Sequence, residues 1–122
     1  MSEHERLLAR YEAMRAEIGL RAVARDCATA DALEAQRAAH RRETLAWQVL
    51  SELREARRGN PGDLALVAAA DQAEAAWEAA RDTAEAVTRQ ASTIARQALE
   101  DSEEDSKRLY EMGLRVRAAR PR

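Results

Sequence analysis

Apolar residues recur along this chain with helical spacing on both sides of one central interruption. After residue 63, alternating steps of four and three residues link positions that are all apolar. These positions are Leu66, Ala70, Ala73, Trp77, Ala80, Ala84, Val87, Ala91, Ile94 and Ala98. A repeat of about 3.5 residues sustained over this length is typical of a helix in a left-handed coiled coil.

The first half carries a similar repeat with smaller side chains. The predicted seam there is Ala28, Ala32, Ala35, Ala39, Arg42, Ala46, Val49, Leu53 and Ala56. Ahead of it, one apolar stripe consists of Leu7, Tyr11, Met14 and Ile18. A second stripe beside it consists of Ala9, Ala13, Ala16 and Leu20. Around Arg21–Ala30 the phase drifts, and Leu20, Val23, Cys27 and Ala30 take over as the apolar positions. Because residues 3–57 contain no proline, one helix is favoured, although Thr29 and Asp31 leave open a break near Ala28–Asp31.

The central interruption, from Arg57 to Asp63, combines several helix-end signals. Gly59 can adopt the left-handed conformation that ends a helix. Asn60 is then expected to cap the next helix, with Pro61 in its first position and Asp63 in its third. A link this short usually joins antiparallel neighbours, and a Gly-Pro linker between unrelated helices is the alternative.

The sequence therefore predicts an all-α fold, a long antiparallel two-helix coiled-coil hairpin with a tight Gly-Asn-Pro-Gly turn. We expect one domain, 1–122, with a helix over 3–57, a turn over 58–62 and a helix over 63–118. Two helices of this length would each extend about 80 Å. Folding back at the turn brings Trp47 and Trp77 to similar heights, where we expect them to meet.

The second seam is interrupted by an acidic patch and then resumes. The patch is Glu100, Asp101, Glu103, Glu104 and Asp105, and the seam continues at Leu109, Met112, Val116 and Ala119. If Ser102 and Asp105 occupy the intervening positions, the phase shifts by one four-residue insertion, a stutter. A break of the helix near Ser102 is the alternative.

The composition limits the chemistry that this chain can perform. Aromatic residues make up 3% of the chain, and Phe is absent, so only a thin core can form. His4 and His40 lack partners at metal-ligand spacing, and Cys27 has no neighbouring histidine or second cysteine. A thin hairpin offers no pocket for the acidic patch to act in. We therefore expect no enzymatic activity, no cofactor and no metal.

Charge and hydropathy indicate which kinds of partner the chain can bind and in which compartment it works. Charged residues make up 34% of the chain, yet the net charge is only -2, which does not favour binding to nucleic acid. No apolar run approaches the roughly 20 residues that span a bilayer. A single cysteine and a charged N-terminus without an apolar signal core favour the cytoplasm.

The C-terminal segment resembles a known family. Acidic residues precede Lys107-Arg108-Leu109-Tyr110-Glu111-Met112, which is followed by Gly113-Leu114-Arg115-Val116-Arg117 and the tail Arg120-Pro121-Arg122. This pattern is similar to the C-terminal end of FliJ/YscO-type proteins of flagellar and type III secretion systems, which are small cytoplasmic helical hairpins. The segment Leu45–Leu50 is faintly similar as well. The alanine-rich second seam departs from that family.

The resemblance implies a non-enzymatic stalk or adaptor that contacts the secretion ATPase, the export gate or a chaperone. It would work in the cytoplasm, peripherally at the inner-membrane secretion machinery, without direct membrane insertion. The implied partner-binding residues are Leu7, Tyr11, Met14, Ile18, Leu109, Met112, Arg115, Val116 and Arg117. Two other functions stay open: an oligomeric helical scaffold, in which copies of the chain associate, and a small helical chaperone that binds a partner protein.

Overall fold

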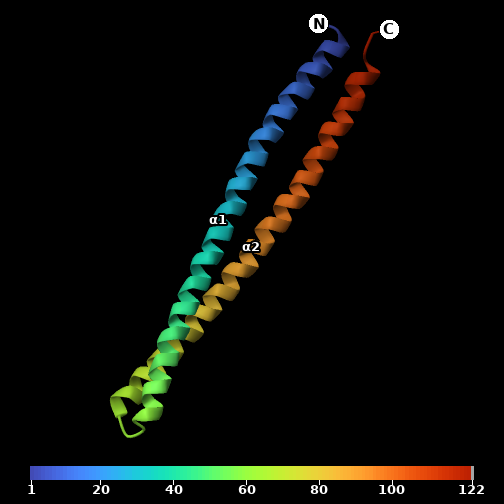
Figure 1. Ribbon diagram of the computed structural model, residues 1–122. Helices are drawn as coiled ribbons and strands as arrows, with labels where there is room; N and C mark the ends of the chain where they lie inside the picture. Colours follow the sequence, from blue (N-terminus) through green and yellow to red (C-terminus); the bar gives the residue numbers. More distant parts are fainter. Residues whose placement is uncertain (122) are drawn as a thin grey trace. The chain divides into compact units, whose positions relative to one another are not determined.

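The computed structural model describes residues 1–121 and shows the predicted helical hairpin. Over this range there are two α-helices and no strand: α1 (Glu3–Gly59) and α2 (Leu64–Ala118). They pack against each other in antiparallel directions, as the ribbon in Figure 1 shows. Arg122, the last residue of the family-like tail, lies outside the described residues.

The chain divides into two compact units, which we describe separately. The terminal unit pairs Met1–Ala30 with the segment of α2 that begins at Thr93, and the turn unit comprises Asp31–Ser92. In the terminal unit, the first residues of α1 lie beside the last turns of α2 (Figure 1). Both chain ends therefore belong to the same unit.

Both helices are uninterrupted. α1 continues through Ala28–Asp31 and α2 continues through Ser102, so neither of the breaks left open by the sequence occurs. Alanine, glutamate, arginine and leucine have high helix propensity, and neither helix contains proline. At the start of α1, the Oγ atom of Ser2 accepts a hydrogen bond from the backbone N–H of Glu5 at 3.1 Å, which caps the helix.

The turn is built differently from the prediction. α1 ends at Gly59, two residues later than expected, and no glycine within residues 1–121 has a positive φ. Asn60 does not cap the second helix, because its side-chain amide donates to the carbonyl of Ala56 at 3.2 Å. The backbone N–H of Asp63 donates to the carbonyl of Asn60 at 3.0 Å and closes a β-turn. Pro61 holds the second position of this turn, where its fixed φ is suitable.

Asp63, rather than Asn60, is the cap of α2. Its Oδ1 atom accepts hydrogen bonds from the backbone N–H groups of Ala65 at 3.0 Å and Leu66 at 3.2 Å. α2 consequently begins at Leu64, and Pro61 lies outside the helix. The carboxylate satisfies two free N–H groups and also lies at the positive end of the helix dipole, which favours it over the preceding asparagine.

In the turn unit, the seam of α2 is as predicted but the seam of α1 is shifted at alternate positions. Ala32, Ala39, Ala46 and Leu53 face α2, whereas Ala35, Arg42 and Val49 are exposed, as is Ala28 in the terminal unit. Their places are taken by Thr29, Gln36, Glu43 and Leu50, each one residue further along. Leu50 is completely buried, whereas Val49 next to it is 52% exposed. Leu50, rather than Val49, is therefore the inner residue at this level of α1.

The two tryptophans meet in the turn unit as expected. The ring centroids of Trp47 and Trp77 are 5.1 Å apart and the ring planes are inclined by 56°. The guanidinium carbons of Arg54 and Arg81 lie 5.8 Å and 4.9 Å from the centroids of Trp47 and Trp77, respectively. Arg54 also forms an ion pair with Glu74 at 3.3 Å, so arginines from both helices cover the aromatic pair.

Neither α1 nor α2 contains a stretch within residues 1–121 that is apolar enough to cross a membrane.

The buried leucine gives the first test of the shifted seam. We expect Leu50→Ala to lower the free energy of unfolding by about 2–5 kcal/mol, because it removes a fully buried side chain and leaves a cavity. Val49→Ala is the matched control and should change it by less than about 0.5 kcal/mol. Urea unfolding followed by circular dichroism measures both, and a larger loss for Val49→Ala would support the seam predicted from sequence.

The capping of α2 gives a second test. Asp63→Ala should lower the free energy of unfolding by about 0.5–2 kcal/mol, because two N–H groups lose their acceptor. Asn60→Ala should have the smaller effect, since it removes only one exposed hydrogen bond at the end of α1. Thermal unfolding of the two variants decides which residue is the cap, and the reverse order would contradict the assignment.

Candidate protein-binding surface of the terminal unit

The terminal unit contains all nine predicted partner-binding residues, but many of them pack between its two helix segments. Leu7, Tyr11, Met14 and Ile18 are half-buried, as is Leu109. Met112 and Val116 are buried, with 5% and 8% of their surface exposed. These side chains form the contact layer of the unit. Met112 and Val116 therefore have too little free surface to contact a partner in this conformation.

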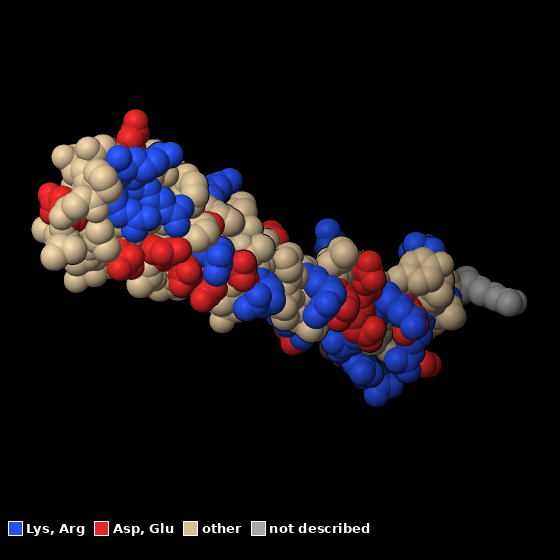
Figure 2. Space-filling model, turned by 90° about the horizontal axis from the view of Figure 1, so that it is seen from below, with Lys and Arg blue, Asp and Glu red and all other residues tan. Residues whose placement is uncertain are grey.

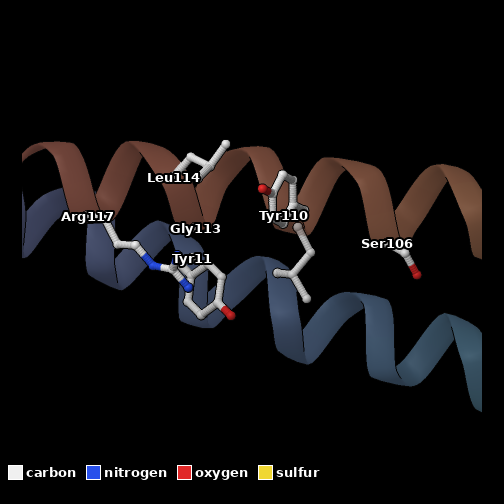
Figure 3. Close-up of a pocket in the computed structure, with 7 residues that line it drawn as sticks. Tyr11, Ser106, Tyr110, Gly113, Leu114 and Arg117 are labelled. Carbon is white, nitrogen blue, oxygen red and sulfur yellow. The ribbon is translucent and has the colours of Figure 1, made fainter.

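One side of this layer opens into a shallow groove. The groove has a volume of about 290 Å³ and is lined by Tyr11, Ser106, Leu109, Tyr110, Gly113, Leu114 and Arg117. Figure 3 shows Tyr110 and Leu114 standing out from α2, while Arg117 extends towards the ring of Tyr11. Tyr110 and Leu114 are 66% and 44% exposed, which is a large free area for apolar side chains. The groove thus combines aromatic and aliphatic surface with one cation.

Gly113 forms part of the groove and brings the helices close at this level. A Cβ atom at this position would lie 3.6 Å from Cε2 of Tyr11, so the tyrosine ring lies against the backbone of α2. Nearer the chain ends, Nδ1 of His4 is 3.3 Å from the carbonyl oxygen of Val116. A carbonyl only accepts, so this contact requires the hydrogen on Nδ1. Both contacts hold α1 against the last turns of α2.

The basic residues at the end of α2 lie on different sides of the helix. Arg117 lines the groove and Arg115 does not, although both are exposed. In the space-filling view, Lys and Arg side chains form groups near both ends of the visible face, with Asp and Glu among them (Figure 2). Cations suit this end of α2 because the helix dipole is negative there.

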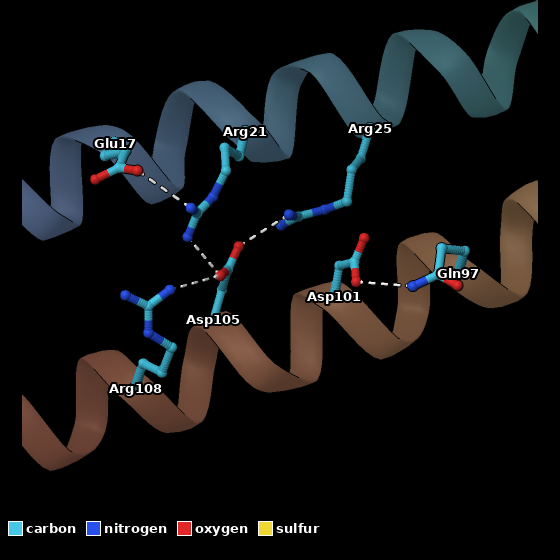
Figure 4. Close-up of polar contacts among 7 residues, drawn as sticks. All are labelled: Glu17, Arg21, Arg25, Gln97, Asp101, Asp105 and Arg108. Carbon is cyan, nitrogen blue, oxygen red and sulfur yellow. Dashed lines mark hydrogen bonds and ion pairs between the residues drawn. The ribbon is translucent and has the colours of Figure 1, made fainter.

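A buried carboxylate lies deeper in the same unit. The Asp105 side chain is only 8% exposed and accepts hydrogen bonds from Arg21 at 2.6 Å and Arg25 at 2.8 Å. Arg108 approaches the same carboxylate at 4.0 Å, and Arg21 is itself held by Glu17 at 3.1 Å (Figure 4). Arginines from α1 therefore converge on a single acidic residue of α2. We call Asp105, Arg21, Arg25 and Arg108 the Asp105 cluster.

The arginines make Asp105 a stronger acid. The hydrogen bond from Arg25 is the largest cause, and Arg21 contributes its charge and a second hydrogen bond, so the pKa of Asp105 falls below its ordinary value of 3.8 although burial opposes this. A carboxyl group with a lowered pKa in the folded state stabilises the fold above the ordinary pKa. That contribution is lost as the pH falls below 3.8 and through the folded-state pKa.

Sequence reasoning found the seam of the terminal unit but missed the groove and the cluster. Ser106, Tyr110, Gly113 and Arg117 recur at steps of four, three and four, a spacing that places them on one face of α2 beside the seam. That spacing was available as a signal. Asp105 was assigned to the seam, but its pairing with Arg21 and Arg25 depends on the register between α1 and α2, which the sequence does not give.

Within residues 1–121, no group of three or more His, Cys, Asp or Glu side chains is arranged to hold a metal ion. No protein-family model, curated protein or solved structure matches the chain.

The Asp105 cluster predicts a specific pH dependence. Asp105→Asn should lower the melting temperature near neutral pH, because Arg21, Arg25 and Arg108 no longer face a carboxylate at this position. The difference between the variant and the unchanged protein should shrink as the pH falls below 3.8. Asp101→Asn is the matched control, since Asp101 is exposed and pairs only with Gln97 at 2.9 Å among the contacts in Figure 4. Equal effects of the two variants at every pH would contradict a special role for Asp105.

Proposed function

We propose that this chain is a non-enzymatic helical-hairpin adaptor that binds a protein partner through the groove of the terminal unit. We further propose that the partner belongs to a type III protein secretion apparatus, with the secretion ATPase as the first candidate and the export gate or an escort chaperone as the others. In this role the protein works in the cytoplasm, peripherally at the inner-membrane secretion machinery.

The exposed groove beside the chain ends is the observation that supports a binding role. Tyr110, Leu114 and Arg117 offer apolar contact area and a cation in one place, and such aromatic and arginine residues contribute most of the energy in protein interfaces. A partner helix that presents apolar side chains and a carboxylate complements this chemistry.

The resemblance of residues 100–122 to FliJ/YscO-type proteins supports the identity of the partner. The groove residues from Ser106 to Arg117 fall inside this segment. The hairpin fold, with both chain ends in one unit, is also what that resemblance leads one to expect.

The proposal predicts the effect of a single change in the groove. Leu114→Glu should weaken binding to the secretion ATPase of the same organism at least about tenfold, because it places a charge in the apolar contact area. The effect of the chain on the rate of ATP hydrolysis should fall in parallel. Calorimetric titration and a steady-state ATPase assay measure these two quantities.

Leu33→Glu is the matched control for this test. Leu33 is 44% exposed, the same fraction as Leu114, but it lies in the turn unit. It should leave binding unchanged. If the unchanged protein does not bind the ATPase, the export gate and chaperones of the apparatus are tested in the same way, and failure with all three contradicts the secretion role. If both glutamate variants bind equally well, the groove is not the binding surface.

A further inference from the structure

α1 carries a second apolar seam on the side of the helix that faces away from α2. Seven residues at alternating steps of four and three form it: Ala9, Ala13, Ala16, Leu20, Val23, Cys27 and Ala30. All seven are exposed, and the two large aliphatic side chains at its centre, Leu20 and Val23, are 75% and 62% exposed. We call this set the outer seam. It lies entirely in the terminal unit.

The outer seam has the pattern of a helix-pairing surface rather than of scattered surface alanines. Three consecutive heptads are apolar at both core positions, and charged residues follow where the pattern ends, at Glu34 and Arg37. Helical geometry separates this face from the packed stripe. Tyr11 contacts α2, whereas Ala9 and Ala13, each two residues away, lie about 200° around the helix. A solvated face needs no such repeat.

The charges beside the outer seam discriminate between orientations of a second helix. In a parallel pair of identical helices, the residue just before Ala13, Leu20 or Cys27 faces the residue five positions further along the other copy. Glu12 would then face Glu17, and Asp26 would face Asp31, so like charges would meet twice on each side. Parallel self-pairing is therefore disfavoured.

An antiparallel pair of identical helices removes these repulsions. With Leu20 of one copy opposite Val23 of the other, Arg10 faces Asp31 and Glu17 faces Ala24. Arg10 lies near the start of the seam, and Asp31 lies directly after its end on the same helix. The two-fold symmetry of a dimer therefore forms the Arg10–Asp31 pair twice, once at each end of the paired seams. Both side chains are exposed.

We infer that the outer seam of α1 is a self-association surface that pairs two copies of this chain in antiparallel orientation. The seam is about 33 Å long and rich in alanine, so the copies approach closely but bury little side-chain area. The dimer is accordingly weak and its population depends on concentration. This inference does not rest on the proposed function, because the groove lies on another side of the terminal unit.

Sedimentation equilibrium from about 1 µM to about 1 mM tests the inference directly, because weak interfaces dissociate in this range. The mass should rise with concentration from 13.6 kDa towards twice that value. Leu20→Glu should keep the protein monomeric, because it places a charge at the centre of the seam. Leu45→Glu is the matched control, since Leu45 is 61% exposed on α1 outside the seam, and it should dimerise like the unchanged protein.

Charge reversal tests the orientation. Arg10→Glu and Asp31→Arg should each weaken the dimer about fivefold, because each disrupts two exposed ion pairs, and the double variant should restore it. Circular dichroism confirms that every variant keeps its helices. Three results would overturn the inference: a monomer at all concentrations, equal dimerisation of the Leu20 and Leu45 variants, or a double variant as weak as the single ones. Dimerisation without binding to any secretion component would uphold it while contradicting the proposed function.

Discussion

The close contact of one helix with another is the constraint on which every other feature of this protein depends. A two-helix fold has no third layer, so the interior is a single line of side chains along each helix. Alanine suits that line because it lets the backbones approach, and only a few larger residues, such as Leu50 and Met112, are buried along it. With so little apolar area to bury, the phase of each helix must be specified by a small number of positions.

The Asp105 cluster contributes polar contacts that help to specify the phase and register of the two helix segments in the terminal unit. In α1, two successive four-residue steps occur at Met14, Ile18 and Ala22. In α2, a seven-residue step from Ala98 to Asp105 is followed by a four-residue step to Leu109, where the earlier alternation would give three. Both seams therefore change phase at the level where Arg21 and Arg25 bind Asp105. Buried ion pairs contribute little net stability compared with apolar packing, but a mispaired buried carboxylate is costly. The cluster thus disfavours other registers of the terminal unit more than it strengthens this one.

The part of the fold that was predictable from sequence is the one whose repeat is apolar at every position. The seam of α2 is of this kind from Leu66 to Ala98, and the hairpin follows from it. In α1, alanine lies on several faces, so the sequence does not distinguish Ala35 from Gln36 as the inner residue, and burial of Leu50 decides the phase. The turn is ambiguous for a similar reason. Asn60 and Asp63 can both cap a helix, and only their side-chain hydrogen bonds in the structure show that Asp63 caps α2 whereas Asn60 bonds back to Ala56. The groove depends on contacts across the helices, as in the case of Tyr11 against Gly113.

Because the inner seams are occupied, the terminal unit can bind other molecules only through its remaining faces, and these differ in chemistry. The groove places tyrosine rings and Arg117 together, which favours a partner with matching shape and charge. The outer seam is apolar throughout, so its shape accepts many amphipathic helices, and only its flanking charges discriminate among them. Another copy of the chain carries the complementary pattern by symmetry. Since Tyr11 and Leu20 lie on different sides of α1, pairing through the outer seam leaves the groove accessible. A dimer would then present two identical grooves, so a partner with several equivalent sites would bind it more tightly than it binds one chain.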